Sequence, residues 1–260
     1  MDVATLFSLR EKTALVTGGS RGIGRMIAEA YLRAGATVFI SARKPDACER
    51  AADELGALGP CVPLPADVSQ ESGRAALVAT IRNYTSQLDI LVNNAGTNWA
   101  APYAEYPVDG FRKVLDLNVS AVFFMTRELT ALLEASAREG DPGRVINVGS
   151  MDGLQVPTIL PGGTFAYSAS KAAVHHLTRT LAVELAPKRI TVNAIAPGYF
   201  ESNMTAHVLR DHRETIESAC PLRRIGAPED MAGVAIYLAS RAGAFTTGTV
   251  IPIDGGTSLT

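Results

Sequence analysis

The stretch TALVTGGSRGIG (residues 13–24) decides the fold class, because an apolar run leads through glycines directly into a helical pattern. The run TALVT is typical of a buried strand in a parallel sheet. Gly18, Gly22 and Gly24 let the backbone turn tightly and approach a phosphate, which the N-terminus of the following helix stabilises. The alternative is that the glycines bind no ligand and are present only because the turn requires positive φ angles. The strand–turn–helix context nevertheless favours a dinucleotide-binding turn.

Strand and helix patterns alternate along the rest of the chain. Strand-like apolar runs occupy residues 13–19, 37–43, 61–69, 88–96, 144–150, 190–198 and 248–256. Helical patterns lie between them, at residues 23–36, 46–58, 72–84, 107–116, 119–138, 167–185, 204–218 and 228–240. This alternation implies right-handed crossovers and a parallel sheet with helices on both faces. We expect one Rossmann-type, doubly wound α/β domain over residues 1–260, with seven parallel strands.

Composition excludes several classes of protein. The 260 residues are 47% hydrophobic and 19% charged, with a net charge of −2, which argues against a nucleic-acid binder or a polybasic membrane protein. No apolar run is long enough to span a membrane, and the first ten residues lack a secretory pattern. Cys48, Cys61 and Cys220 are odd in number and widely spaced, so we expect reduced thiols in a cytoplasmic protein. No cluster has metal-ligand spacing.

The end of the second expected strand indicates the type of dinucleotide. A site for NAD normally has a carboxylate here to bind the ribose hydroxyls, but the chain reads Ser41-Ala42-Arg43-Lys44. Arg43 can pair with a 2′-phosphate through its planar guanidinium, and Arg21 in the glycine turn can help. NADP(H) is therefore the expected cofactor, ahead of NAD. The alternative is that both arginines are ordinary solvated side chains.

The stretch YSASK (residues 167–171) places a phenol and an ammonium on one helical face. Tyr167 and Lys171 are four residues apart, and a nearby cation lowers the pKa of a phenol. The alternative is an exposed tyrosine beside a solvated lysine. Two further polar residues stand out: Ser150 ends a strand, and Asn118 lies near the start of a helical stretch where an aliphatic residue would pack better.

Taken together, these motifs resemble the short-chain dehydrogenase/reductase family. The resemblance rests on TGGSRGIG, NNAG (residues 93–96), Asn118, Ser150, YSASK and the Pro197-Gly198 pair, which follow one another in the family's order over about residues 12–256. It implies an enzyme that transfers a hydride between a nicotinamide cofactor and a carbonyl or secondary alcohol.

The resemblance also implies a catalytic tetrad. Tyr167 is expected to protonate the carbonyl oxygen, and Lys171 to lower the tyrosine pKa and to bind the nicotinamide ribose. Ser150 is expected to hydrogen-bond the substrate oxygen. Asn118 is expected to hold a water that connects Lys171 to solvent.

The cofactor contacts implied by the resemblance run along the carboxyl ends of the strands. Asp67 is expected to accept from the adenine amino group, and Asn94 to lie beside the adenosine ribose. As alternatives, Asp67 could be a helix cap and Asn94 a turn residue. Ser202 stands where the family usually has threonine. The full expected set is Gly18, Ser20, Arg21, Gly22, Ile23, Gly24, Arg43, Asp67, Val68, Asn94, Ala95, Gly96, Tyr167, Lys171, Pro197, Gly198 and Ser202.

One departure from the family concerns the loop between Ser150 and Tyr167. The separation is 17 residues, which is longer than usual for the family, so residues 151–166 are expected to contain an insertion. Residues 151–166 and 199–220 are the expected substrate-loop segments. The longer loop has a proline- and glycine-rich turn (Pro157, Pro161, Gly162, Gly163) and apolar residues that could form a wall or contact a partner subunit (Leu154, Val156, Ile159, Leu160, Phe165).

The substrate expectation rests on resemblance alone. Within the family, the sequence of residues 91–107 and 143–150 resembles that of 3-oxoacyl-carrier-protein reductases, in particular the rhamnolipid-biosynthesis branch. An acyl thioester is therefore expected, held by apolar side chains (Trp99, Tyr103, Leu154, Ile159, Met204). An acyl carrier protein could dock on basic ones (Lys188, Arg189, Arg210, Arg213). These residues could equally be core and surface residues.

Two rival functions stay open. One is oxidation or reduction of a sugar, polyol or other secondary alcohol, and the other is a non-catalytic dinucleotide sensor or scaffold. The stretches 108–136 and 167–186 carry more apolar faces than one sheet surface needs. In the family such helices pair between subunits, so a homo-oligomer is expected, with a tetramer favoured.

Overall fold

The computed structural model describes residues 2–157 and 163–260, and in them seven parallel strands form one sheet. The strand order is β3-β2-β1-β4-β5-β6-β7, which confirms the predicted Rossmann-type, doubly wound sheet. The strands are β1 (Thr13–Thr17), β2 (Thr37–Ser41), β3 (Cys61–Pro63), β4 (Ile90–Asn93), β5 (Gly143–Val148), β6 (Ile190–Pro197) and β7 (Val250–Ile253).

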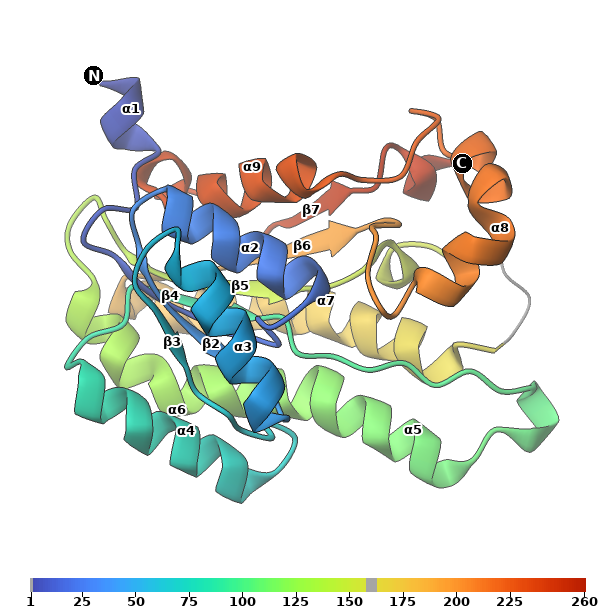
Figure 1. Cartoon of the computed structure of the whole chain (residues 1–260), viewed down its shortest axis with the longest axis horizontal. Helices are drawn as coiled ribbons and strands as arrows, with labels where there is room; N and C mark the ends of the chain where they lie inside the picture. Colours follow the sequence, from blue (N-terminus) through green and yellow to red (C-terminus); the bar gives the residue numbers. More distant parts are fainter. Residues whose placement is uncertain (1, 158–162) are drawn as a thin grey trace.

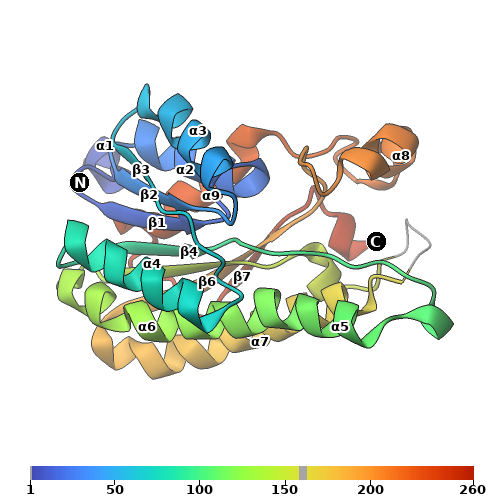
Figure 2. The ribbon, with the colours of Figure 1, turned by 60° about the horizontal axis from the view of Figure 1, so that its bottom comes forward.

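Helices cover both faces of the sheet, as Figure 2 shows. One layer holds α2 (Gly22–Arg33), α3 (Pro45–Gly56) and α9 (Pro228–Ala239). The opposite layer holds α4 (Glu71–Tyr84), α5 (Val108–Leu115), α6 (Ala121–Ser136) and α7 (Phe165–Leu185). Two helices lie outside these layers: α1 (Val3–Leu6) at the N-terminus and α8 (Ala206–Ala219) near the C-terminus (Figure 1).

Two apolar cores lie on the two faces of the sheet, because successive side chains of a strand point in opposite directions. In β1, Ala14 and Val16 pack in the core that includes Ile27 of α2, whereas Leu15 packs in the core that includes Leu129 of α6. All three β1 side chains have no exposed surface. Burial on both faces explains why the strands read as continuous apolar runs.

The strand order reverses between β1 and β4, which places a crevice at their carboxyl ends. The Thr17 hydroxyl ties the two strand ends together, since it accepts from the backbone N–H groups of Asn94 (3.0 Å) and Ala95 (3.1 Å). α8 and the C-terminus lie toward this end of the molecule, far from the N-terminus (Figures 1 and 2).

The structure corrects some predicted boundaries. The third strand is only Cys61–Pro63, although the backbone N–H groups of Leu64 and Ala66 beyond it still donate to the carbonyls of Ile40 (2.8 Å) and Ala42 (3.0 Å). The predicted helices at 107–116 and 119–138 are one continuous helical run, in which a π-helical turn, Asp116–Ser120, joins α5 to α6. α7 begins two residues earlier than predicted, and α1 was not predicted.

The described residues also bear on the class predictions. None of the helices described in the chain is long and apolar enough to cross a membrane. All three cysteines are free thiols, in agreement with the expectation from their number and spacing.

Candidate active site

Tyr167 and Lys171 occupy the first two turns of α7, at the carboxyl end of the sheet. The Lys171 ammonium lies 5.5 Å from the centre of the Tyr167 ring and donates to the backbone carbonyl of Val148 at 2.7 Å. Lys171 is only 6% exposed, and no carboxylate lies within ion-pair distance of it among residues 2–157 and 163–260. A buried cation without a carboxylate partner is typical of a functional site.

Burial shifts both of these groups toward their neutral forms. It raises the pKa of Tyr167 to about 12, with a further contribution from the charge of Asp152, while the hydrogen bond with Ser150 acts in the opposite direction. Burial lowers the pKa of Lys171 to about 8. The direction of the tyrosine pKa shift is opposite to the sequence-based expectation, because burial is its largest cause. Tyr167 is therefore a protonated phenol at neutral pH, which is a proton donor.

Ser150 lies just beyond β5, where the strand gives way to a short 3₁₀ turn, Met151–Gly153. Its hydroxyl accepts from the backbone N–H of Asp152 at 3.1 Å, and the residue as a whole is 7% exposed. Its backbone N–H donates to Nε2 of His175 at 3.4 Å. His175 is one turn beyond Lys171 on α7, so the same helix carries Tyr167, Lys171 and the side chain beneath Ser150.

Asn118 is placed by the π-helical turn Asp116–Ser120. π-turns occur frequently at functional sites, because they change which side chains face inward. The Asn118 amide donates to the Thr97 carbonyl and to the Ser170 hydroxyl, both at 3.0 Å, and its oxygen accepts from the Thr97 N–H at 2.9 Å. A Cβ on Gly96 would lie 3.4 Å from the Asn118 oxygen and 3.8 Å from the Lys171 ammonium. Asn118 and Lys171 therefore flank the same glycine.

The glycine turn has the form that a pyrophosphate needs. Gly18 and Gly22 have positive φ angles of 68° and 54°, which favour glycine. A Cβ on Gly24 would lie 2.4 Å from the Gly18 carbonyl oxygen, so only glycine lets the N-terminus of α2 pack this closely. Asn94 holds the turn from outside, since its amide donates to the carbonyls of Thr17 (2.8 Å) and Gly18 (3.2 Å). Asn94 thus supports the shape of the turn.

Two cations lie close to this turn and are free for an anion. The backbone N–H of Gly19 donates to the Ser41 carbonyl at 3.1 Å, which holds the turn against the end of β2. Arg43, two residues beyond β2, and Arg21, which precedes α2, are both exposed. Within the described part of the chain, neither guanidinium forms an ion pair or a side-chain hydrogen bond. This arrangement fits a phosphate on the adenosine ribose.

Other expected cofactor residues lie along the same edge of the sheet. One oxygen of Asp67, which follows β3, accepts from the Ser69 hydroxyl (2.7 Å) and backbone N–H (3.1 Å), so this carboxylate also shapes a turn. Val68 is buried beside it. Pro197 ends β6, and the Gly198 N–H donates to the Ile253 carbonyl at 2.9 Å.

Ser202 faces the glycine turn from the segment after β6. A Cβ on Gly22 would lie 3.1 Å from the Ser202 Cβ. The Ser202 hydroxyl lies 3.0 Å from the Thr205 hydroxyl, which fixes the start of the segment leading into α8. The segment after β6 thus lies close to the start of α2.

The expected apolar wall is only partly formed by the described residues. Leu154 and Met204 are about two-fifths exposed at 40% and 42%, and Phe165 contacts Tyr103 with ring centres 5.8 Å apart. Trp99 instead covers α5, since a Cβ on Gly110 would lie 2.7 Å from its ring. Four residues expected in the turn and wall, Ile159, Leu160, Pro161 and Gly162, lie outside the described residues.

Three residues near the tetrad were not singled out from the sequence. Burial raises the pKa of Asp152 to about 6, against the attraction of Lys171. Burial lowers the pKa of His175 to about 4, so its imidazole is neutral. Burial raises the pKa of Tyr199, which follows Gly198, to about 12. Only His175 had a sequence signal, because it lies four residues beyond Lys171 on the same helical face.

The described residues contain no group of three or more His, Cys, Asp or Glu side chains that could hold a metal ion. The site therefore consists of a phenol, an ammonium, a hydroxyl and an amide, beside a glycine turn and two free guanidinium groups.

Comparison with known proteins identifies the family. A family model described as enoyl-(acyl carrier protein) reductase matches residues 18–258. The rhamnolipids biosynthesis 3-oxoacyl-[acyl-carrier-protein] reductase of Pseudomonas aeruginosa is 50% identical over 97% of this chain and 98% of its own length. The 5-keto-D-gluconate 5-reductase of Escherichia coli is 36% identical over 96% of this chain and 97% of its own length.

Solved structures agree with these relatives. The Pseudomonas aeruginosa RhlG/NADP active-site complex matches with a TM-score of 0.93 and 49% identity, over 98% of this chain and 99% of that one. A short-chain type dehydrogenase/reductase from Mycobacterium marinum matches with a TM-score of 0.91 and 37% identity, over 98% and 99% of the two chains. The chain therefore belongs to the short-chain dehydrogenase/reductase family.

Proposed function

We propose that the protein is an NADP(H)-dependent reductase that acts on the 3-oxo group of an acyl thioester. The observation that carries this proposal is the protonated phenol of Tyr167, held beside Ser150 and one helical turn before the buried cation of Lys171. A carbonyl oxygen placed between the phenol and the Ser150 hydroxyl would receive a proton from the first and a hydrogen bond from the second. When bound, the nicotinamide cofactor supplies the hydride that goes to the carbonyl carbon.

The remaining residues support proton supply and charge balance. As the Tyr167 proton passes to the substrate oxygen, a phenolate forms, and the Lys171 ammonium nearby stabilises it. Asn118, which flanks Gly96 together with Lys171, is positioned to bind a water that returns a proton from solvent. Acid–base assistance of this kind contributes a factor of about 100 to 10,000 to the rate.

The residues present fit NADP(H). The glycine turn has room only for backbone at Gly18 and Gly24, and Arg21 and Arg43 have no other partner among the described side chains. Ser20, Ile23, Val68, Ala95 and Gly96 complete the edge of the sheet along which the cofactor would lie. The similar RhlG structure, an NADP active-site complex, supports the same assignment.

The acyl thioester is favoured by the half-identical relative from Pseudomonas aeruginosa, which is named a 3-oxoacyl reductase. A sugar acid is the second candidate, because the 36% identical relative from Escherichia coli is named a 5-keto-D-gluconate reductase. A non-catalytic sensor is disfavoured, since all four side chains of the expected tetrad are present and lie together.

The decisive experiment combines cofactor binding with turnover. Purified protein is titrated with NADPH and with NADH by fluorescence, and acetoacetyl and longer 3-oxoacyl thioesters are then added while NADPH absorbance is followed. We expect tight NADPH binding and thioester-dependent oxidation, both in the wild type, and loss of turnover in Tyr167→Phe. NADPH binding with turnover of 5-keto-D-gluconate alone would replace the acyl assignment by the sugar one.

A matched pair of variants tests the cofactor assignment. Arg43→Leu should weaken NADPH binding by about tenfold or more, because it removes a charge-assisted contact, and should leave NADH binding almost unchanged. Lys44→Leu, at the neighbouring exposed position, should change neither. Equal weakening by the two variants would show that Arg43 has no specific phosphate contact.

Further features of the proposal concern assembly and location. We infer a cytoplasmic homotetramer, with the apolar outer faces of α5, α6 and α7 as the contact. Phe111, Phe123 and Val183 are 38%, 38% and 78% exposed there. Sedimentation that shows only monomer at micromolar concentration would contradict it.

Docking of an acyl carrier protein has weaker support. Lys188 pairs with Glu134 at 2.8 Å and Arg213 with Glu217 at 3.1 Å, so half of the expected basic dock is already neutralised. The loops over residues 151–166 and 199–220 are the segments proposed to border the substrate.

A further inference from the structure

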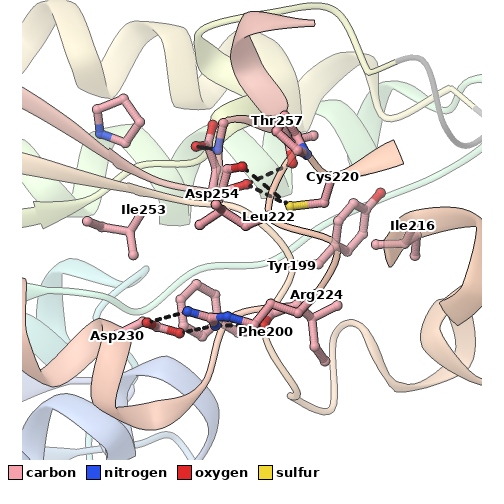
Figure 3. A pocket seen from close by; sticks show the side chains of 16 residues that line it. Tyr199, Phe200, Ile216, Cys220, Leu222, Arg224, Asp230, Ile253, Asp254 and Thr257 are labelled. Atoms are coloured by element: carbon pink, nitrogen blue, oxygen red, sulfur yellow. Dashed lines mark hydrogen bonds and ion pairs between the residues drawn. The ribbon is translucent and has the colours of Figure 1, made fainter. Parts of the chain in front are cut away.

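A cavity of about 440 Å³ is lined by Tyr199, which directly follows the Pro197-Gly198 pair. It opens between the segment after β6, the C-terminal end of α8 and the turn after β7 (Figure 3). Its volume is within the range of small-molecule pockets. Its lining includes Tyr199, Phe200, Ile216, Cys220, Leu222 and Ile253.

The charged side chains of this cavity are already committed to partners within its wall. Arg224 pairs with Asp230, with one N–H donating at 2.9 Å, as the dashed lines in Figure 3 show. The Asp254 carboxylate accepts from the backbone N–H groups of Gly256 and Ser258, both at 3.0 Å. The Cys220 thiol faces the carbonyls of Asp254 (3.7 Å) and Gly255 (3.5 Å).

What the wall offers a ligand is therefore mainly apolar surface. Leu222, at 63% exposure, and the partly buried Ile253 present apolar surface to the cavity, whereas Phe200 and Ile216 are each 2% exposed and add little. Burying a hydrocarbon here gains the usual hydrophobic free energy, whereas a sugar would leave hydroxyl groups without partners.

Two lining residues, Tyr199 and Thr257, relate the cavity to the segments that carry the tetrad. Tyr199 directly follows Gly198, whose N–H is held by β7, and the charge of Asp152 acts on both Tyr199 and Tyr167. Gln155, from the loop after Ser150, donates to the carbonyl of Thr257, which lines the cavity, at 3.1 Å. The cavity wall is thus tied to the loop that follows Ser150.

We propose that this cavity receives the hydrocarbon chain of the acyl substrate and that Leu222, Cys220 and Ile216 limit its length. This inference rests on the proposed reduction of 3-oxoacyl thioesters. The carbonyl end stays at Ser150 and Tyr167, and the chain beyond it passes Tyr199 and replaces water against Leu222 and Ile253.

The test compares two exposed leucines near the C-terminal end of the chain. Leu222→Trp narrows the mouth of the cavity, whereas Leu259→Trp makes the same change at an 87% exposed side chain that does not line it. We expect Leu222→Trp to lower kcat/KM for a long-chain 3-oxoacyl thioester at least about tenfold more than for the acetoacetyl thioester. Leu259→Trp should keep the wild-type ratio. An equal effect of Leu222→Trp on both substrates would overturn the inference.

A binding measurement separates failure of the cavity from failure of the reaction. Calorimetry is performed with a saturated long-chain acyl thioester, which lacks the 3-oxo group and cannot be reduced. Binding to the wild type that weakens about tenfold in Leu222→Trp supports the cavity even if no 3-oxoacyl thioester is turned over, in which case only the proposed reaction fails. Absence of wild-type binding, or equal binding to both proteins, would overturn the cavity assignment whatever the turnover.

Discussion

Buried charges are handled in opposite ways at the two ends of the sheet. At the amino ends of the strands, Lys12 pairs with Asp89 (3.1 Å) and Asp141 (2.7 Å), and Arg144 pairs with Asp141 (3.1 Å). At the carboxyl ends, Lys171 is equally well buried, yet its one hydrogen bond among the described residues goes to a backbone carbonyl.

The difference separates stability from chemistry. Burial lowers the pKa of Arg144, but the Asp141 carboxylate offsets that effect, so the guanidinium stays charged. No carboxylate pairs directly with Lys171 among the described residues, and the more distant charge of Asp152 opposes burial only in part, so the pKa of Lys171 falls to about 8, close to physiological pH. A paired buried charge holds segments together, whereas an unpaired one is ready to interact with a ligand or a proton.

The largest expected effect is at the carboxyl end. Tyr167→Phe removes the proton donor, and Lys171→Met removes the cation, so each should lower kcat by a factor of about 100 to 10,000. Neither change leaves an opposite charge unpaired at ion-pair distance, so both proteins should keep nearly the wild-type free energy of unfolding. Initial rates and urea denaturation measure the two quantities. Severe destabilisation by either variant would contradict the separation of roles.

At the amino ends of the strands, a substitution should lower stability and leave kcat almost unchanged. Asp141→Asn removes the ion-pair partner of Arg144, whose side chain is only 2% exposed, and one of the two partners of Lys12, which keeps Asp89. We expect about 3 kcal/mol or more of destabilisation, with almost unchanged kcat at a temperature where the variant is folded. Glu54→Gln is the control, because its pair with Arg25 is exposed and should contribute less than about 1 kcal/mol. Similar losses in the two variants would show that burial does not matter here.

The pH dependence of reduction should reveal the unpaired lysine. Because the pKa of Lys171 is about 8 and that of Tyr167 about 12, kcat/KM should fall as pH rises through about 8, when the ammonium loses its proton. The charge of Asp152 raises the pKa of Lys171, so Asp152→Asn should move this alkaline limb to lower pH. Asp109→Asn, at an exposed site on α5, should leave it in place. A limb that appears only near pH 12 would assign it to the tyrosine instead.

The sequence predicted best those elements that depend on only a few neighbouring residues. The strand–turn–helix at residues 13–24 and the existence of all seven strands were predicted correctly, because an apolar run that ends in glycines is a pattern of a few neighbouring residues. The third strand was predicted too long, since its regular pairing with β2 ends at Pro63 and only separate hydrogen bonds from Leu64 and Ala66 continue beyond it. The π-turn that carries Asn118 has no distinguishing periodicity, so the sequence showed only a helix.

The environment of the site could not be predicted in the same way. Asn94 binds the backbone of Thr17, which is 77 residues away in the chain. The direction of the Tyr167 pKa shift depends on burial that only the tertiary structure determines. Asp152 lies in a single 3₁₀ turn with no pattern, so nothing in the sequence marked it as a neighbour of the tetrad.

The smallest expected effect concerns His175, a buried side chain that contacts the backbone of the catalytic Ser150. It is 4% exposed and neutral, its Nε2 accepts from the Ser150 N–H, and its Nδ1 has no partner among the described residues. The imidazole packs closely against two glycines, since a Cβ on Gly149 or Gly153 would lie 2.1 or 2.8 Å from it. His175→Leu should therefore displace Ser150 slightly and lower kcat about fivefold, the equivalent of one ordinary hydrogen bond, with little change in KM for NADPH.

The neighbouring His176 provides the control, because it is exposed on the same helix. His176→Leu should leave kcat unchanged, and His175→Gln, whose amide can accept from the Ser150 N–H, should recover part of the lost rate. A structural role alone would lower the melting temperature of both His175 variants without separating their kcat values. Recovery by glutamine but not by leucine would show that the fixed position of Ser150, rather than core packing alone, connects this buried imidazole to catalysis.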